Sequence, residues 1–257
     1  MTARKTITAL AVLLLSAAAN AGPSPQDILA ASDAVRNPDY PFGLTNTLIE
    51  YRNGKQADTS TLAIYSKADR NSGQFRSLIR YVAPPRDASK LILFAGRDMW
   101  FYDPASKASI RLSPQQRLLG QASNGDVVTI NFSRDYQATQ ATEEDTQDGE
   151  RQNKHCYKLT MSASTPDATY HHVEMWVETA NARPVKARFY TESSKLLKTA
   201  YYRRYQKLFG IERPTEIVII DGLDPEWVTV MRYSDWVKRE VPEIWLQRDY
   251  LPRFKPE

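Results

Sequence analysis

The chain has 257 residues, a formal net charge of +4 at pH 7, 42% hydrophobic residues and 25% charged residues. This composition is typical of a globular protein and argues against a disordered, collagen-like or polytopic membrane chain. Its single cysteine, Cys156, excludes an internal disulfide framework and a multi-thiolate zinc site. The fold must therefore be stabilised by its core.

The first residues have the three-part pattern of a secretory signal peptide. Arg4 and Lys5 precede an apolar run over 7–19, and Ala19-Asn20-Ala21 offers small residues to a signal peptidase. We therefore predict a signal peptide at 1–21, cleaved after Ala21, and Sec export to the periplasm. The apolar run is shorter than the roughly 20 residues that span a bilayer. Export and a mature net charge near +2 also argue against a nucleic-acid partner.

The mature chain, 22–257, has the size of a single all-β domain. It begins with a helix signal, in which Ser24 is the cap, Pro25 the first helical residue and Asp27 an acid in the first turn. A helix of about three turns is predicted from there to Asn37-Pro38. Its apolar stripe would contain Ile28, Leu29, Ala31 and Val35.

Most of the remaining chain alternates apolar and polar residues with period two, as half-buried antiparallel strands do. The clearest apolar positions are Phe75, Ile79 and Tyr81; Tyr157, Leu159 and Met161; Val173, Met175 and Val177; and Val185, Ala187 and Phe189. Turn signals such as Asn53-Gly54 and Asp221-Gly222 separate these segments. We predict roughly ten or eleven strands in an antiparallel sandwich or barrel.

Two further pieces break the strand pattern. Residues 118–136 look like a loop that leads into a short helix, and 242–246 could form one more helical turn. Together with the first helix, these pieces are most simply buried by covering one concave face of the sheet.

The sequence offers little catalytic chemistry. If 163 pairs with 170 in a hairpin, Cys156 lies opposite Val177, and His171 lies opposite Ser162, about 20 Å along the strand from His155. Cys156 would share the wetter face with Lys158, without a base beside it. We therefore predict no catalytic residue, no metal ligand and no cofactor. His172 and the acidic run at 143–145 are interpreted as structural and solvated, and a paired-acid glycosidase stays open.

The central segment resembles the periplasmic outer-membrane lipoprotein-sorting (LolA-like) family, and most closely its branch associated with exporters of the resistance-nodulation-division and mycobacterial-membrane-protein-large type. The resemblance is carried by Pro84-Pro85-Arg86-Asp87, Leu91-Ile92-Leu93-Phe94, Gly96-Arg97-Asp98-Met99-Trp100-Phe101-Tyr102-Asp103-Pro104 and Ile110-Arg111-Leu112-Ser113. It implies a mainly β fold, namely an incomplete antiparallel β-barrel of about eleven strands covered by lid helices.

The resemblance also implies a non-enzymatic function. A monomeric carrier or chaperone would bind the acyl chains of a lipoprotein or other lipid in an apolar cavity and move it toward the outer membrane with an inner-membrane exporter. The alternatives are a periplasmic module that senses lipids or lipoproteins, and a lipid-acting hydrolase. Candidate cavity residues are Phe75, Ile79, Tyr81, Leu91, Leu93, Trp100 and Tyr102 on strands, and Val127, Val128, Ile130 and Phe132 on a middle lid helix. Either Trp100 and Tyr102 or Met99 and Phe101 would point inward.

Overall fold

The computed structural model describes residues 22–255, so the predicted signal peptide lies outside the described residues. Helix α1 (Pro25–Arg36) precedes strands β1 (Phe42–Arg52), β2 (Lys55–Ala68), β3 (Phe75–Ala83), β4 (Leu91–Ala95), β5 (Asp98–Asp103) and β6 (Ala108–Leu112). The middle contains the short elements β7 (Arg117–Leu119), β8 (Ala122–Ser123), α2 (Asn124–Val127) and α3 (Phe132–Asp135).

The second half is again made of strands. These are β9 (Tyr136–Gln147), β10 (Asn153–Ala163), β11 (His172–Glu178), β12 (Pro184–Tyr190), β13 (Leu196–Leu208), β14 (Ile211–Asp221) and β15 (Trp227–Lys238). Two 3-10 helices, η1 (Glu243–Leu246) and η2 (Arg248–Arg253), follow them. Within residues 22–255, no helix is both long and apolar enough to cross a membrane.

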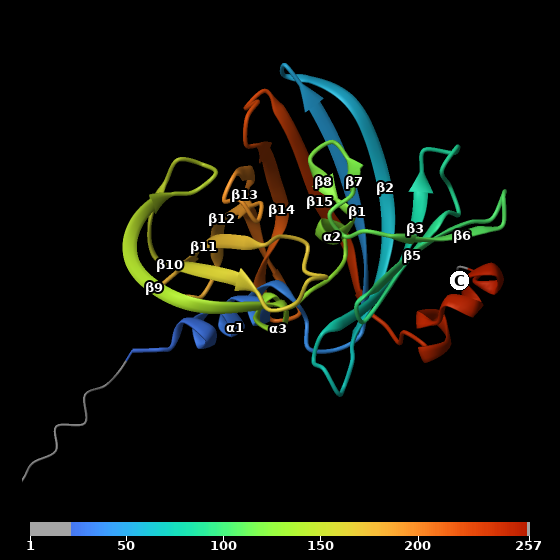
Figure 1. Ribbon diagram of the computed structural model, residues 1–257, viewed down its shortest axis with the longest axis horizontal. Coiled ribbons are helices and arrows are strands. Elements are labelled where there is room, and N and C mark those ends of the chain that lie inside the picture. Colours follow the sequence, from blue (N-terminus) through green and yellow to red (C-terminus); the bar gives the residue numbers. More distant parts are fainter. Residues whose placement is uncertain (1–21, 256–257) are drawn as a thin grey trace, which may run out of the picture.

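One antiparallel sheet dominates the described chain. Its strand order is β6-β5-β4-β3-β2-β1-β15-β14-β13-β12-β11-β10-β9, and β7 pairs only with β8. The sheet bends strongly, with α1 and α3 side by side across one end and α2 on its concave side (Figure 1). The edge strands β6 and β9 do not meet, so the barrel stays open. The predicted fold class, an incomplete barrel with a few helices, is confirmed.

The predicted number of strands is too low, because the sheet has thirteen strands within residues 22–255 and the small β7-β8 pair adds two. The short strands do not show the period-two alternation of apolar and polar residues. In β6, the burial of successive residues does not alternate regularly, and the strand is largely exposed at the sheet edge. A period-two pattern appears only where one face is buried and the other is wet.

Helix α1 forms as predicted. Ser24 Oγ accepts a hydrogen bond from the Asp27 N–H at 3.2 Å, and the helix stops before Asn37-Pro38, where the residue preceding proline disfavours helical backbone. Ile28 and Leu29 are buried, but Ala31 is exposed. The buried face continues instead through polar residues, whose role is described below.

The β10-β11 hairpin differs from the prediction by one residue, since Cys156 pairs with Glu178 and Ser162 with His172. The observed register sets Leu159 opposite Met175, so the apolar faces of both strands point to the same side. The predicted register would have opposed Leu159 to a glutamate. Because a one-residue slip moves a whole apolar set to the other face, core burial selects the observed pairing.

Cys156 lies on the outer face of β10, as predicted, but this position is not wet. Its side chain is fully buried beneath Trp176 and Val185. The register between β11 and β12 shifts between Trp176 and Val177. Because of this shift, the Val185 side chain points to the outer face of the sheet, away from the face of Ala187. The predicted inward position of Val185 is therefore wrong.

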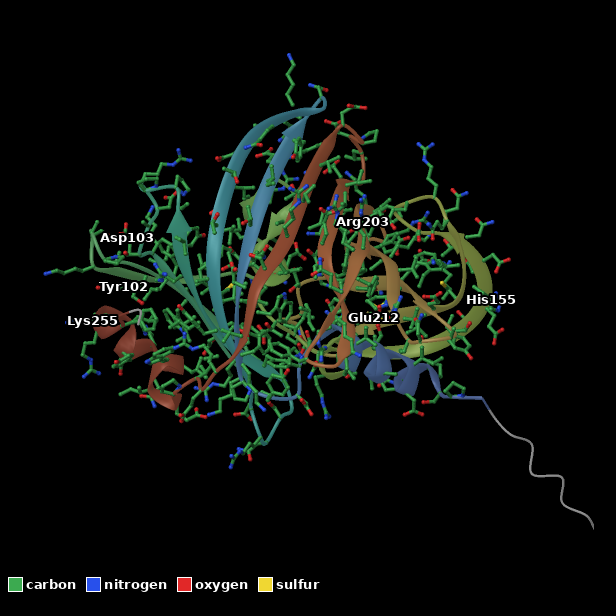
Figure 2. All side chains as sticks on the ribbon, turned by 180° about the vertical axis from the view of Figure 1, so that it is seen from behind. Tyr102, Asp103, His155, Arg203, Glu212 and Lys255 are labelled. Atoms are coloured by element: carbon green, nitrogen blue, oxygen red, sulfur yellow. The ribbon has the colours of Figure 1, made fainter. Side chains whose placement is uncertain are left out.

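The part of the sheet around β2 to β5 is apolar on both faces. Met99 and Phe101 of β5 pack toward the main core, whereas Trp100 and Tyr102 face the C-terminal segment, residues 239–254. That segment covers the second face with Trp245, among others. Tyr102 and His155 lie at opposite sides of the molecule (Figure 2). The structure thus settles which β5 side chains face the main core.

Candidate ligand cavity

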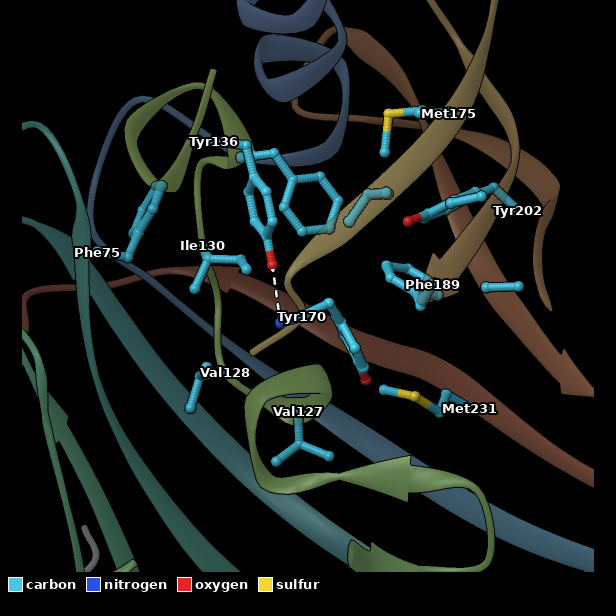
Figure 3. Packing of buried hydrophobic residues seen from close by; sticks show 14 of the residues in the cluster. Phe75, Val127, Val128, Ile130, Tyr136, Tyr170, Met175, Phe189, Tyr202 and Met231 are labelled. Carbon is cyan, nitrogen blue, oxygen red and sulfur yellow. Dashed lines mark hydrogen bonds between the residues drawn. The ribbon is translucent and has the colours of Figure 1, made fainter. Parts of the chain in front are cut away.

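A largely buried, mainly apolar cavity of about 100 Å³ lies between the concave face of the sheet and residues 124–136, which we call the cover segment. The cover segment contributes Val127, Val128, Ile130 and Phe132 to its lining. The sheet contributes Phe42, Phe189, Ala200, Tyr202, Ile219 and Met231, among others. Figure 3 shows Ile130 of the cover segment on one side of the core and Phe189, Tyr202 and Met231 of the sheet on the other. The cavity can accept an apolar group and little else.

The predicted cavity residues divide into three groups. Val127, Val128, Ile130 and Phe132 line the cavity, although on two single turns joined by extended backbone and not on one helix. Phe75 and Ile79 are buried in the main core without reaching the cavity, and Tyr81 packs against that core. Leu91, Leu93, Trp100 and Tyr102 belong to the opposite face of the sheet, against the C-terminal segment. Whether any of them contacts a ligand stays a prediction.

The cavity residues that the sequence did not indicate come mostly from strands β12 to β15 and β1. Ala200 and Tyr202 of β13 and Ile217 and Ile219 of β14 line the cavity, but 200–202 and 217–220 have no alternation of apolar and polar residues that would indicate it. Their position opposite the cover segment is a property of the bent sheet.

The buried polar face of α1 holds the cover segment in place. Asp33 accepts hydrogen bonds from the backbone N–H groups of Phe132 at 3.0 Å and Ser133 at 2.7 Å. Asn37 Nδ2 donates to the Ile130 carbonyl at 2.8 Å. Arg36 pairs with Asp33 and places its guanidinium 4.3 Å from the centre of the Phe132 ring. A neutral hydrogen bond contributes about 0.5–1.5 kcal/mol and one to a charged group such as Asp33 about 1.5–3 kcal/mol, so the cover segment is held by contacts that can be broken one by one.

A buried arginine fixes α1 from the sheet side. Arg213 of β14 is almost fully buried, and its Nη1 donates to the carbonyls of Ala34 and Val35 at 3.0 and 2.8 Å. These carbonyls belong to the last turn of the helix, where a cation is favoured by the helix dipole. The attachment keeps α1 beside the cavity.

The other end of the cover segment is fixed by a buried ion pair. Lys198 of β13 contacts the Asp126 carboxylate and donates to the Gln121 carbonyl at 2.8 Å. The same carboxylate accepts from the Tyr170 hydroxyl at 2.7 Å and from the Ser123 N–H at 2.8 Å. Burial lowers the pKa of Lys198, and the charge of Asp126 opposes that shift. The pair satisfies two charges that would otherwise be costly to bury.

The charged groups that line the cavity, Arg36 and Asp126, are held in ion pairs, and two of the lining phenols stay neutral. Burial raises the pKa of Tyr202 to about 12. Burial, followed by the nearby Asp126 charge, raises the pKa of Tyr170 well above its ordinary value. Neither side chain therefore carries a charge at physiological pH, and the lining stays suited to an apolar ligand.

The histidines and the cysteine remain apart from the cavity. His155 is exposed on β10 and contacts Asp145 at 2.8 Å and Glu143 at 3.2 Å (Figure 2). His172 Nδ1 lies 3.4 Å from Ser162 Oγ. Among residues 22–255, no group of three or more His, Cys, Asp or Glu side chains is placed to hold a metal ion.

Comparison with solved structures identifies the fold family. A LolA superfamily protein from Nitrosomonas europaea shares 32% of its residues with this chain, with a TM-score of 0.79 over 89% of this chain and 100% of that one. This chain belongs to the LolA superfamily. A family model described as 'Uncharacterized protein' also matches residues 73–253 of this chain. A search of curated proteins finds no match.

Two more distant structures share the same LolA fold. A DUF1329 family protein from Desulfovibrio piger has 22% identity and a TM-score of 0.74 over 88% of this chain and 97% of that one. An outer-membrane lipoprotein-sorting protein domain from Vibrio parahaemolyticus has 17% identity and a TM-score of 0.70 over 89% of this chain and 98% of that one. The recognised resemblance to LolA-like proteins is thus confirmed.

Proposed function

We propose that this LolA superfamily protein is a non-enzymatic periplasmic carrier that binds acyl chains of a lipoprotein or another lipid in the cavity beneath its cover segment. The observation that carries the proposal is the largely buried, mainly apolar cavity between the sheet and a cover segment held by breakable polar contacts. Each CH₂ group of an acyl chain that is buried in the cavity contributes about 0.8 kcal/mol of favourable free energy, and this favours the bound chain over the chain in water.

The size of the cavity indicates that the closed structure is the unloaded form. An engineered protein cavity of about 150 Å³ holds one benzene molecule. The cavity here, at about 100 Å³, is smaller, so a long acyl chain requires the cover segment to move outward. The contacts of α1 with the cover segment are the ones that must open.

The proposed carrier moves its cargo across the periplasm. It is exported through the predicted signal peptide at 1–21, and it acts as a monomer. An inner-membrane exporter of the resistance-nodulation-division type would hand over the cargo for transport to the outer membrane. Deletion of the chromosomal gene for this protein should then lower the amount of cargo in the outer membrane, and no enzymatic product should be lost.

Binding is tested with purified mature protein and cis-parinaric acid, a fatty acid that fluoresces when buried. We expect saturable binding that palmitoyl lysophospholipids displace. Ala200→Leu inserts three carbon atoms into the cavity and should weaken binding at least tenfold. Ala108→Leu, on the exposed edge strand β6, is the matched control and should leave binding unchanged. A protein that takes up no acyl probe would contradict the carrier function.

A further inference from the structure

A second, open pocket of about 630 Å³ lies directly outside the cavity. It is formed by the loop before β11 at Thr169, Tyr170 and His171, by the β12-β13 hairpin at 190–193, and by Leu197. Thr169 and Tyr170 line both this outer pocket and the cavity. These two residues therefore form a wall that separates the two spaces.

The Tyr170 part of the wall is a side chain held by hydrogen bonds. Its hydroxyl donates to Asp126 at 2.7 Å and lies 2.7 Å from Ser123 Oγ. Its backbone N–H donates to the Tyr136 hydroxyl at 3.1 Å, and its ring centre lies 4.4 Å from that of Phe189. Figure 3 shows Tyr170 between the cover segment and β12. Rotating this ring breaks side-chain contacts and leaves the strand pairing of the sheet intact.

The Thr169 part of the wall depends on a glycine of the cover segment. A Cβ at Gly125 would lie 2.1 Å from Thr169 Oγ1, so only glycine permits this close approach. The wall is thus made where the cover segment touches the loop before β11. Outward movement of the cover would separate Gly125 from Thr169 and join the two spaces.

The outer pocket combines apolar and polar groups. Leu197, which is 38% exposed, and the Tyr190 ring provide apolar surface, whereas Thr191 and Ser193 provide hydroxyls. His171 and Glu192 also face this solvent-open space, and within residues 22–255 neither side chain has a hydrogen-bonding or ionic partner. Such a lining suits the polar head of an amphiphile whose chain continues inward.

We propose that an acyl chain reaches the cavity past Tyr170, and that the outer pocket then holds the polar head of the same molecule. This inference rests on the proposed carrier function. The outer pocket is large enough to receive a head group without rearrangement, and the wall that blocks the chain is a hydrogen-bonded side chain. The geometry therefore orders the events, with capture outside preceding passage inside.

Aromatic side chains cover another part of the cavity. Trp236 lines it there, stacked on Phe42 with ring centres 5.5 Å apart and in edge contact with Phe209 at 6.4 Å. Passage there would require several stacked rings to separate. The experiment compares the two places directly.

Stopped-flow mixing with cis-parinaric acid measures how fast the chain enters and leaves. Tyr170→Phe keeps the ring and removes its hydroxyl contacts, so both rates should rise about three- to tenfold, the factor expected for one or two lost hydrogen bonds. Ser193→Trp narrows the outer pocket and should slow both rates at least threefold. Ser106→Trp in the β5-β6 turn is the matched control, and Trp236→Ala opens the cavity lining at Trp236.

Three results are informative. Slowing by Ser193→Trp alone supports passage at Tyr170. Faster entry and release in Trp236→Ala, with unchanged rates for Ser193→Trp and Tyr170→Phe, would overturn the passage but leave the carrier function standing. No probe binding by the unmodified protein overturns both.

The head-group site has its own test, in which the probe is palmitoyl lysophosphatidylethanolamine. The double variant His171→Ala with Glu192→Ala should bind it at least threefold more weakly, with the affinity for cis-parinaric acid unchanged. Equal affinities of the variant and the unmodified protein for the lysophospholipid would overturn the assignment of the outer pocket. Both substituted side chains are solvent-exposed, so folding should be preserved.

Discussion

Cys156 shows how the surroundings of one residue decide its chemistry. Burial, with the nearby Glu178 charge second, raises the pKa of its thiol to about 12. The thiolate is the reactive form of cysteine, and it is almost absent at neutral pH under these conditions. The burial beneath Trp176 also blocks access of reagents.

We therefore expect native protein to resist labelling by iodoacetamide at pH 7.5, and the protein unfolded in urea to be labelled fully. Mass spectrometry of the intact chain reports both states. Rapid labelling of the native protein would contradict the buried position, and Lys158→Ala, a change on the same face of β10, is expected to leave the result unaltered.

The Lys198 and Asp126 pair gives a stability prediction. Lys198→Met leaves the Asp126 carboxylate buried without its cation, which should lower the free energy of unfolding by about 3–5 kcal/mol. The double variant Lys198→Met with Asp126→Asn removes both charges and should recover part of that loss. Urea unfolding measures the three proteins, and equal stability of Lys198→Met and the unmodified chain would refute the pairing.

At the scale of elements, the C-terminal segment is fastened to the sheet by Glu243. Its carboxylate contacts Lys67 Nζ at 2.6 Å and Arg76 Nη1 at 2.8 Å. Arg76 also donates to the Leu246 carbonyl at 2.7 Å, and the Arg248 guanidinium lies 3.7 Å from the centre of the Trp100 ring. The segment thus covers the second apolar face of the sheet through both charge and ring contacts.

Glu243 should make this attachment sensitive to acid. The hydrogen bond from Lys67, with the charges of Lys67 and Arg76, holds the pKa of the Glu243 carboxyl below its usual value. Its folded pKa is then lower than its unfolded one, so the stabilisation is present above the unfolded pKa, near 4.3, and is lost as pH falls through the folded pKa. Because the side chain is 58% exposed, the contribution is at most about 1 kcal/mol.

The measurement is urea unfolding of Glu243→Gln at pH 7 and pH 3. The variant should be less stable than the unmodified protein at pH 7, and the difference should shrink at pH 3. Glu240→Gln, an exposed change in the same segment, is the control. A stability difference that stays constant over this range would show that the carboxylate charge contributes nothing.

At the scale of the whole molecule, the bent sheet and the cover segment act together, since the cavity exists only between them. A ligand that binds the folded form alone stabilises it by about 2.7 kcal/mol at a concentration of 100 times its Kd. For a domain of this size, that corresponds to a rise in Tm of roughly 5–10 °C.

We therefore expect palmitoyl lysophosphatidylglycerol, kept below its micelle concentration, to raise the Tm of the mature protein by that amount in scanning calorimetry. Ala200→Leu should show a smaller rise at the same concentration, and Ala108→Leu the full one. A Tm that is unchanged at every ligand concentration would contradict binding to the folded form.

The local pattern of the chain was sufficient for several elements. The cap at Ser24 and the Asn37-Pro38 stop predicted α1, and the alternation around Leu159 and Met175 predicted two strands, because such signals depend on neighbours in sequence.

 The register between these strands, by contrast, follows from which faces are buried together, and it was predicted one residue away from its true position.

By itself, the sequence determined a β-rich chain with a capped first helix and a family resemblance in the segment around Trp100. These depend on local propensity, on period-two alternation and on contiguous motifs. Only the tertiary structure decided that Trp100 and Tyr102 face the C-terminal segment, that Ala200 and Met231 line the cavity, and that Tyr170 separates it from the outer pocket. The physical reason is that a cavity is formed by side chains far apart in the chain, and their meeting depends on how the sheet bends.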